Sequence, residues 1–296
     1  MTVAGPAAGE LAEVERLVRV ALRGGDDAQL RMLAWGEIGP VLGWPADAPA
    51  FALKRLPPFG SRAGADALAA TLADYIAALA ARGLACVPSD VRVIDDADGV
   101  VGWVVQPLLP AAGLGPEVLR GADPAAGHPL LDAVLDADLA IPGPRLALDG
   151  QLSNFAWDGE RPLYLDVTTP LLFDDHGQLR MDMDLLLASL PAALRPAVRR
   201  WVVPDLLRRY RDPRSVVLDL LGNLLKERLD PWVPVALARV GGRLPEPISE
   251  AEVRRAYRSD ARLWEVLLRL RRLDRSWQRS VRRREYPFLL PGRIER

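Results

Sequence analysis

The order of apolar and polar positions divides the chain into a strand-rich first third and a helix-rich remainder. Up to residue 107, short apolar runs alternate with turns that contain glycine, proline or aspartate, a pattern typical of strands in an antiparallel sheet. Five such runs predict five strands. Two of them flank the glycines at positions 36 and 39, and the others cover Phe51–Leu56, Val91–Asp95 and Val101–Val105.

One long helix is predicted inside the strand-rich part. Between residues 65 and 81, four large apolar side chains recur at the spacing of one helical face. They are Leu68, Leu72, Tyr75 and Leu79. The helix therefore follows the third strand and has one side to bury.

Downstream of residue 115 the apolar spacing becomes helical. The first of these helices ends at Pro142-Gly-Pro144. Its apolar side consists of Leu130, Leu131, Val134, Leu135 and Leu139. Further helices are predicted over residues 185–190, 196–210 and 213–229, and a last long helix begins near residue 249.

Two helix starts carry capping signals. Asp212 directly before Pro213 predicts an N-cap followed by proline at the first helical position. Ser249 with Glu252 predicts a capping box, and Ile248 with Val253 predicts a hydrophobic staple across the same helix start.

The composition narrows the class of protein. The 296 residues are half apolar and carry a net charge of −1, so the chain can bury a core and has no overall attraction to nucleic acid or to an anionic membrane. One cysteine, Cys86, excludes an internal disulfide, and nothing around His128 or His176 resembles a zinc site or a Ser-His-Asp triad. No targeting segment and no run of eighteen apolar residues occurs, which predicts a cytoplasmic protein without a membrane span.

Lysine is rare in this chain. Of the 38 basic residues only Lys54 and Lys226 are lysine. Lys54 lies in the middle of the apolar run Phe51–Leu56, which indicates chemistry that needs a compact ammonium group. The alternative is a surface lysine whose ammonium reaches solvent.

Three polar residues in one stretch point to phosphoryl transfer. Asp149 and Asn154 form the pattern D-x-x-x-x-N, and Asp166 follows twelve residues later at the end of a short apolar strand. In kinase-type sites one aspartate orients the acceptor hydroxyl, while an asparagine and a second aspartate hold magnesium. Chance is a rival explanation for this motif alone, because aspartate is common in the chain.

A glycine pattern lies upstream of the lysine. Gly36 and Gly39 stand between two short strands, where backbone amides can approach phosphate oxygens without an intervening Cβ. An ordinary hairpin turn would give the same pattern. The run from Leu33 to Val41 resembles the protein-kinase glycine loop L-G-x-G-x-F-G-x-V, with Ala34 and Ile38 in place of its first glycine and its phenylalanine.

The remaining motifs follow in the order that this superfamily uses. Ala52-Leu-Lys54 is similar to the A-x-K of its third strand, and Asp149, Asn154 and Asp166 complete the series. The chain therefore resembles the protein-kinase-like superfamily, on the side of the aminoglycoside and choline phosphotransferases. The resemblance covers Leu33 to Thr169.

This resemblance implies a two-lobe fold, with an N-terminal lobe over residues 1–107 and a mostly helical C-terminal lobe over residues 108–296. The Pro- and Gly-rich stretch 108–115 would separate the lobes, and a catalytic-type loop would cover residues 145–169. It also implies ATP and magnesium as cofactors. Lys54 would hold the nucleotide phosphates, Asp149 would be catalytic, and Asn154 and Asp166 would bind metal. Contacts to the nucleotide would come from Gly36, Gly39, Val41, Ala52 and Gln106, with Val104 beside them in an apolar slot for adenine.

The chain departs from the family in three places. The family histidine two residues before the catalytic aspartate is Ala147 here, and Asp166 is followed by Val-Thr-Thr instead of Phe-Gly. No glutamate occurs between Glu37 and Glu117, so the helix lacks the usual partner of the lysine. Asp74 is the best substitute by spacing, although it lies away from the apolar face.

The sequence thus predicts phosphoryl transfer from ATP to a hydroxyl of an unidentified small molecule. Two alternatives remain: an inactive kinase-like protein that binds nucleotide or acts as a scaffold, and a nucleotidyl transferase on the same fold. The last 46 residues carry fourteen arginines and six acids, with Trp264 and Trp277 among them. Such a basic helix is typical either of contact with an anionic partner, such as RNA, a phosphorylated substrate or a membrane surface, or of a solvated face with internal ion pairs.

Overall fold

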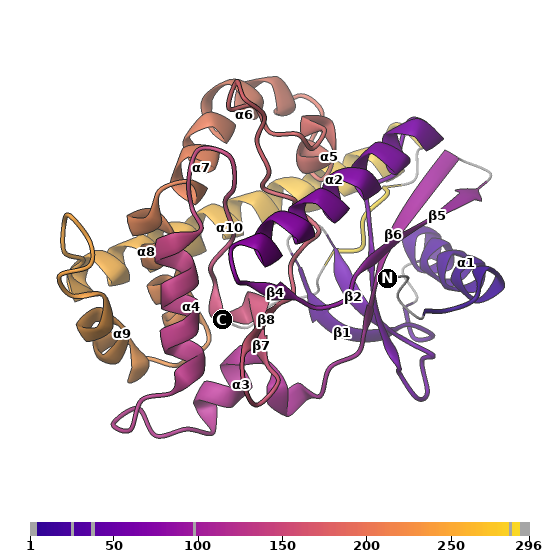
Figure 1. Ribbon diagram of the computed structural model, residues 1–296. Coiled ribbons are helices and arrows are strands. Elements are labelled where there is room, and N and C mark those ends of the chain that lie inside the picture. The colour runs from indigo at the N-terminus through magenta and orange to yellow at the C-terminus, as the bar shows by residue number, and fades with distance from the viewer. Residues whose placement is uncertain (1–4, 25–26, 37–38, 97–98, 284–285, 291–296) are drawn as a thin grey trace.

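The computed structural model describes residues 5–24, 27–36, 39–96, 99–283 and 286–290. A strand-rich part is followed by a helix-rich part (Figure 1). The α+β class, the five-stranded antiparallel sheet and the helical C-terminal part predicted from the sequence are confirmed.

Five antiparallel strands form the main sheet, in the order β1-β2-β3-β6-β5. In the pairing register, Val41 of β2 and Val104 of β6 lie on either side of Lys54 in β3. Directly paired residues share a face of the sheet, so these three side chains point to the same side. The strands are β1 (Arg31–Trp35), β2 (Pro40–Trp44), β3 (Phe51–Arg55), β5 (Asp90–Asp96) and β6 (Gly99–Pro107).

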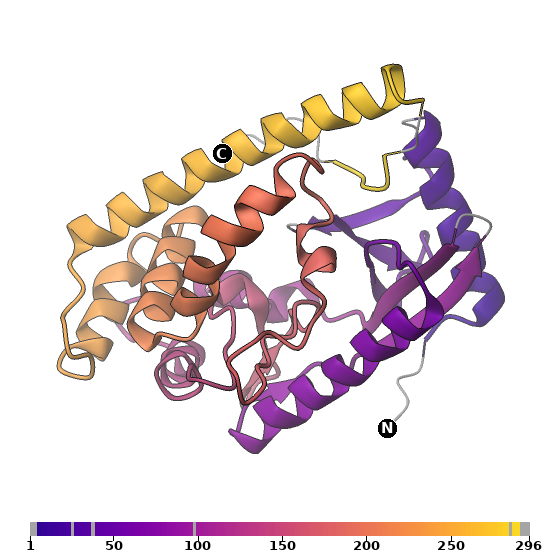
Figure 2. The ribbon, with the colours of Figure 1, turned by 90° about the horizontal axis from the view of Figure 1, so that it is seen from above.

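The two faces of the sheet are covered by different helices. Helix α1 (Ala8–Gly24) packs its apolar side against Leu42, Leu53 and Trp103. Helix α2 (Arg62–Ala81) lies across the opposite face, and the sheet is seen between the two helices in Figure 2. The apolar residues predicted for α2 are all buried: Leu68, Leu72, Tyr75 and Leu79.

Helix α2 also has the length and apolar composition of a membrane-spanning helix. Among the described residues it is the one helix that is long and apolar enough, by length and composition, to cross a bilayer. Its buried side chains belong to the main core, as in the core helix of a globular domain. The described part of the chain therefore has no clear membrane span, while the predicted cytoplasmic location stays a prediction.

The structure has a second, smaller sheet. Of its strands only the short apolar strand before Asp166, which is β8 (Pro162–Tyr164), was predicted. The sheet has the order β4-β8-β7, with β4 (Ala85–Cys86) parallel to β8 and β8 antiparallel to β7 (Phe155–Trp157). Strands of two or three residues are too short to show a sequence period. Through β4, the segment after α2 is joined to the hairpin that carries the predicted catalytic-type loop.

The remainder of the chain is helical. Helix α4 begins after its N-cap His128, whose Nδ1 accepts from Leu130 N at 3.1 Å. The helices are α3 (Gly115–Arg120), α4 (Pro129–Ala140), α5 (Met183–Leu187), α6 (Arg195–Trp201), α7 (Val203–Tyr210), α8 (Pro213–Lys226), α9 (Trp232–Val240) and α10 (Glu250–Ser280), with short 3₁₀ turns at Ala111–Gly113 and Leu152–Asn154.

Three predicted helices have different bounds in the structure. The helix expected over residues 185–190 is α5, which covers Met183–Leu187. The helix expected over residues 196–210 is divided into α6 and α7, because Pro204 has no N–H to continue the hydrogen-bond ladder of the preceding turn. The helix expected over 213–229 ends at Lys226, and Arg228 adopts a left-handed φ of 58°. Helix α9 was not predicted.

The predicted caps are confirmed. The carboxylate of Asp212 accepts from Ser215 N at 3.0 Å, and the hydroxyl of Ser249 accepts from Glu252 N at 3.2 Å. Ile248 and Val253 are both buried in the main core, as a staple requires. These caps fix where α8 and α10 begin.

The C-terminal end returns to the N-terminal part of the fold. Helix α10 runs along one edge of the molecule to the end of α1 (Figure 2), where Arg279 donates to the carbonyl of Leu22. Residues 286–290 follow, and Pro287 O accepts from Arg55 at 3.1 Å while Tyr286 donates to Ser189 O at 3.4 Å. The end of the chain thus contacts both the sheet and the helical part.

Candidate functional site

One face of the main sheet gathers the residues predicted to contact a nucleotide. Val41, Ala52, Lys54 and Gln106 are half-buried and share this face, because Val41 pairs with Lys54 and Ala52 pairs with Gln106. Val104, opposite Lys54, is fully buried at their base. The sheet thus offers a shallow apolar surface with one ammonium group, on the side away from α1.

Arg55, the residue after Lys54 in β3, points to the opposite face of the sheet. Arg55 points toward α1, where its guanidinium forms an ion pair with the buried carboxylate of Glu15 at 2.7 Å. Consecutive strand residues point to opposite faces. Of these two basic residues, Lys54 is therefore the one whose charge lies on the face of the predicted site.

The glycine turn between β1 and β2 lies directly against Lys54. Gly36 N donates to Gly39 O at 2.9 Å and closes the turn. A Cβ built on Gly36 would lie 3.2 Å from Gly39 O, which is a tight contact, and 3.5 Å from Lys54 Cε, which is an ordinary contact. Glu37 and Ile38, the residues between the glycines, lie outside the described residues.

Lys54 contacts Asp166, the last residue of the predicted motifs. Its Nζ donates to Asp166 Oδ1 at 3.0 Å and to the Thr168 hydroxyl at 2.5 Å. The carboxylate of Asp166 also accepts from the Thr168 hydroxyl. Two residues that are 112 positions apart in the chain therefore meet. The sequence assigned both to one site but did not predict this contact, and Thr168 was missed.

The charge on Asp166 is maintained by this arrangement. Burial disfavours the ionised carboxylate, but the ammonium of Lys54 and the hydrogen bonds from Thr168 and Lys54 outweigh it and hold the pKa of Asp166 below its ordinary value. Asp166 is therefore a carboxylate at neutral pH, which is the form that binds a metal ion.

The predicted catalytic-type loop is folded around Asn154. Its amide nitrogen donates to Asp149 O at 3.1 Å, which directs the other amide atom, an oxygen acceptor, away from that contact. Asn154 also accepts with its backbone oxygen from Leu165 N at 2.8 Å. Asn154 and Asp166 therefore lie at the same open end of the β7–β8 hairpin.

Two buried tyrosines fix the backbone before and at Asp149. The hydroxyl of Tyr75 on α2 donates to Ala147 O at 2.9 Å, and the hydroxyl of Tyr164 on β8 lies 3.3 Å from Asp149 N and 3.4 Å from Asp149 O. Burial raises the pKa of both phenols well above the ordinary value, so both remain protonated donors. Neither tyrosine was predicted as part of the site, although Tyr75 reaches the carbonyl of Ala147, which occupies the position of the family histidine.

Asn223 supports the same loop from α8. Its Oδ1 accepts from Ser153 N at 3.2 Å, and its Nδ2 donates to Gln151 Oε1 at 3.3 Å and to the Ser153 hydroxyl at 3.2 Å. The chain has only two asparagines, and both are in this site. The rarity of asparagine was the signal that would have identified Asn223.

Gln106 has a structural contact as well as a place on the face of the sheet predicted to contact a nucleotide. Its amide nitrogen donates to Leu165 O and to the Ser89 hydroxyl, both at 2.9 Å. Because Leu165 precedes Asp166, this side chain links the last strand of the main sheet to the predicted metal ligand.

Asp74 is not the partner of Lys54, and that expectation was wrong. Its carboxylate forms an exposed ion pair with Arg180 at 2.6 Å. Asp74 precedes the buried Tyr75 on α2, so the helical turn directs it away from the face that packs on the sheet. The acidic partner of Lys54 is Asp166 instead.

A magnesium ion would need ligands beyond the protein. Within the described ranges, no group of three or more His, Cys, Asp or Glu side chains is placed to hold a metal. Magnesium commonly binds through one or two protein oxygens together with substrate phosphates and water. The Asn154 amide and the Asp166 carboxylate fit that mode, in which nucleotide and metal bind together.

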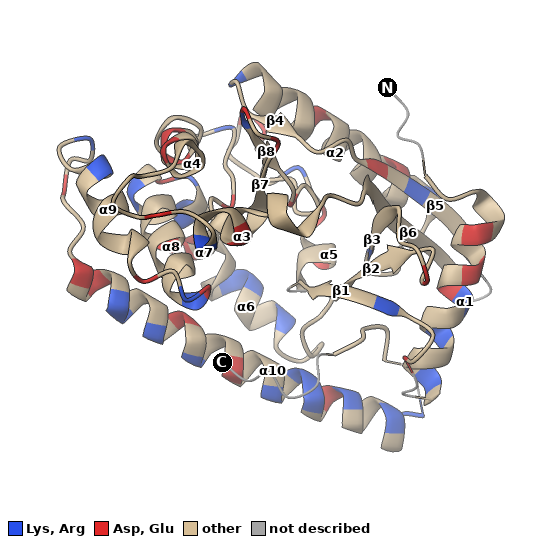
Figure 3. Cartoon of the chain, turned by 90° about the horizontal axis from the view of Figure 1, so that it is seen from below, with Lys and Arg blue, Asp and Glu red and all other residues tan. Residues whose placement is uncertain are grey.

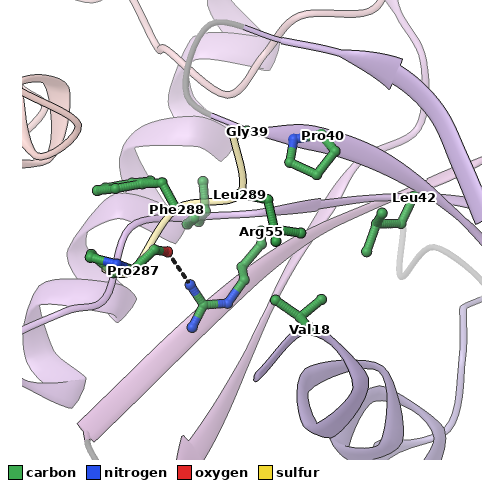
Figure 4. A pocket seen from close by; sticks show the side chains of 9 residues that line it. Val18, Gly39, Pro40, Leu42, Arg55, Pro287, Phe288 and Leu289 are labelled. Carbon is green, nitrogen blue, oxygen red and sulfur yellow. Dashed lines mark hydrogen bonds between the residues drawn. The ribbon is translucent and has the colours of Figure 1, made fainter. Parts of the chain in front are cut away.

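A hollow beside Gly39 lies on the other side of the sheet. Figure 4 shows it between Val18, Leu42 and Arg55 on one side and Phe288 and Leu289 of the C-terminal segment on the other. Its volume of about 20 Å³ holds a single water molecule. It is a packing gap under the C-terminal segment and not a ligand site.

A buried carboxyl group lies directly beneath the loop. Asp138 on α4 is fully buried, and neither of its carboxyl oxygens has a hydrogen-bond partner among the described residues. A Cβ on Gly150 would come within 2.1 Å of Asp138 Oδ1, so glycine is required next to Asp149. Burial, with the charges of Asp149 and Asp219, raises the pKa of Asp138 well above 3.8.

This carboxyl predicts a specific pH dependence of stability. Above pH 3.8 the unfolded chain loses the proton of Asp138 while the folded protein retains it, so the free energy of unfolding falls as pH rises. Asp138→Asn resembles the neutral acid and has no proton to lose. At about pH 4 the variant and wild type should have nearly equal free energies of unfolding. At about pH 8 the variant should be more stable, by about 1.4 kcal/mol for each pH unit over which folded wild type retains the proton.

Urea unfolding at both pH values measures this difference. Asp136→Asn is the matched control, because Asp136 lies on the same helix with an exposed ion pair to Arg243 at 2.6 Å. An Asp138→Asn difference that is the same at both pH values would show that Asp138 is ionised in the folded protein.

Comparison with protein families gives a match over most of the chain. The model of a family described as a family of unknown function (DUF6206) matches residues 13–275. No curated protein matches the chain.

Proposed function

The chain belongs to DUF6206, a family of unknown function, and from that starting point we propose that it is an ATP- and magnesium-dependent phosphotransferase acting on a hydroxyl of a small molecule. The observation that carries the proposal is the meeting of Lys54 with Asp166 at 3.0 Å beside the turn at Gly36. A glycine turn, a lysine and a strand-ending aspartate at one point form the phosphate- and metal-binding part of kinase-type sites.

The arrangement of strands supports a kinase-like two-lobe fold for this proposal. The strand order β1-β2-β3-β6-β5 places the lysine strand at the centre of the sheet, and the chain enters the helical part after Pro107. The loop with Asp149 and Asn154 then precedes the β7–β8 hairpin, and Asp166 follows it. Fold likeness alone does not decide function, so the proposal rests on the site.

Each side chain has a role under this proposal. Lys54 holds the nucleotide phosphates, and the amides of the turn at Gly36 and Gly39 approach the same oxygens. Asn154 and Asp166 hold magnesium, which neutralises phosphate charge when bound. Asp149 accepts the hydrogen bond of the acceptor hydroxyl and orients it toward the phosphate.

A second candidate is nucleotide binding without turnover. It is favoured by Ala147 at the position where the resemblance places histidine, and by the pairing of Asp74 with Arg180 in place of Lys54. Under this candidate the Lys54–Asp166 pair opens to bind nucleotide, and the protein uses the bound state to present a surface.

Ligand-induced stabilisation tests whether nucleotide binds. With ATP and magnesium at 100 times the dissociation constant, linkage gives about 2.7 kcal/mol of stabilisation, which a thermal-shift assay detects as a raised Tm. The shift should be larger with magnesium than without it, because Asn154 and Asp166 supply metal ligands.

Measuring the products formed from ATP, beside the Tm shift, separates the candidates. Conversion of ATP to ADP in the presence of a hydroxyl acceptor supports phosphoryl transfer, and release of pyrophosphate indicates nucleotidyl transfer. A Tm shift with no product from any acceptor supports the binding protein. An unchanged Tm at millimolar ATP, with and without magnesium, contradicts both candidates.

A further inference from the structure

Helix α10 presents a second functional surface, separate from the proposed site. Its 31 residues lie along one edge of the molecule, and Figure 3 shows basic residues along its whole length. One side is anchored in the fold: Val253 is fully buried in the main core, and the guanidinium of Arg271 lies over the Phe288 ring. The opposite side faces solvent.

The solvent side carries an apolar ridge. Four large apolar side chains there are about half exposed or more: Leu263 at 52%, Val266 at 51%, Leu273 at 67% and Trp277 at 49%. With the half-buried Leu270 they recur at intervals of three, four, three and four residues. This is the a/d spacing of a coiled coil, in which two helices bury such a ridge against each other.

The width of the ridge favours a helix as its partner. Two apolar positions in each heptad form a narrow seam, whereas a helix that lies on a membrane or packs on a globular core needs a wider apolar face. Arginines occupy the flank on one side of the seam, and Asp260 and Asp274 occupy the other flank. Acidic residues beside the ridge are unfavourable for contact with an anionic membrane.

The charges also select an orientation. When Leu263 and Leu270 are a positions, Arg255, Arg262 and Arg269 are g positions, and Asp260 and Asp274 are e positions. In a parallel pair, each g residue meets the e residue five positions later on the partner helix. Arg255 then faces Asp260 of the second copy and Arg269 faces Asp274, while Arg262 faces the apolar Leu267 at the e position between them. An antiparallel pair would place arginine against arginine.

We propose that α10 pairs with α10 of a second copy of this chain as a parallel two-stranded coiled coil, and that the protein is a dimer. The anchored side of α10 faces away from the seam, so the two molecules lie on opposite sides of the helix pair. These charges already have contacts within one molecule. Arg269 forms an exposed pair with Glu265 at 2.6 Å, Asp274 accepts from Gln278 at 2.7 Å, and Asp260 also has a contact. The exposed Arg269–Glu265 pair competes weakly with the pairing across the seam.

Measurement of the mass in solution tests the proposal. By light scattering after size exclusion, at up to about 100 µM protein, wild type should have twice the chain mass of 32.4 kDa. Leu273→Asp should reduce this to a single chain mass without loss of folding, because Leu273 is exposed. Trp201→Asp is the matched control, since Trp201 is 74% exposed on α6 and its replacement should leave the dimer intact.

Disulfide trapping tests the orientation. Ser259 and Ser280 continue the d positions at the two ends of the seam. In a Cys86→Ser background, Ser259→Cys should cross-link to itself under mild oxidation, and Ser280→Cys likewise. A mixture of the two variants should give no mixed disulfide in the parallel pair.

Four results would overturn the proposal. They are a single chain mass for wild type at the highest concentration, a dimer that survives Leu273→Asp, a mixed disulfide as the main product, and wild-type monomers that bind phosphatidylserine vesicles in a manner lost in Leu273→Asp. The last result would assign the ridge to a membrane surface. Each outcome can be obtained with the apo protein, so none depends on the proposed phosphotransferase activity.

Discussion

Replacing Lys54 with arginine should leave the fold intact and remove most of the affinity for ATP with magnesium. The ammonium fits between Gly36, Asp166 Oδ1 and the Thr168 hydroxyl, at 3.0 and 2.5 Å from the last two. A guanidinium is larger, planar and differently hydrated, so we expect that it cannot replace the ammonium in the same contacts to Asp166 and Thr168. We expect a loss of about 1.5–3 kcal/mol in binding, or about ten- to a hundred-fold in Kd.

The matched control is Lys226→Arg, the same change at the other lysine. Lys226 is exposed at the end of α8, so this variant should bind ATP like wild type. Isothermal titration gives both Kd values, and circular dichroism checks the fold. Equal affinity in the two variants would mean that Lys54 takes no part in nucleotide binding.

Replacing Asp149 with asparagine should abolish turnover while ATP still binds. Asp149 is half-buried on the loop that Asn154, Tyr164 and Asn223 hold in place, so the substitution should not displace the backbone. Removing a general base or an acceptor-orienting carboxylate lowers rates by about 10²–10⁴-fold. The measurement is product formation with an identified acceptor beside the Tm shift with ATP and magnesium.

Asp166→Asn serves as the contrasting variant, because Asp166 is the proposed metal ligand. It should lose the magnesium-dependent part of the Tm shift, whereas Asp149→Asn should keep it. Wild-type turnover in Asp149→Asn would assign the acceptor role to another residue. A full magnesium effect in Asp166→Asn would remove the metal role from that carboxylate.

Short motifs in the sequence led to the candidate residues of the site, whose roles stay predictions. Lys54 and Asp166 were predicted because each sits in a short pattern with a fixed order along the chain, and the structure places them in contact. The strands, α2 and the caps at Asp212 and Ser249 followed from apolar spacing and capping chemistry. These signals depend only on residues close together in the sequence, so they can be recognised without knowledge of the fold.

The missed contacts depend on tertiary structure. Tyr75, Tyr164 and Thr168 act through hydroxyl contacts that depend on how distant segments pack, and such contacts leave no spacing in the sequence. Asp74 was chosen by its distance from Lys54 along the chain, but the helical turn directs it to solvent and to Arg180. The break between α6 and α7 had a local signal, Pro204, which was outweighed by apolar spacing.

The return of the C-terminal segment to the sheet restricts how the molecule can open. The sheet is attached to the helical part at Pro107 and again through Arg279, Arg55 and the Pro287 carbonyl. Lys54 with Asp166, Gln106 with Leu165, and β4 with β8 join the same two parts. The sheet therefore cannot rotate as a rigid body without breaking several of these contacts. A wide rotation of the sheet relative to the helical part also requires prior release of residues 286–290.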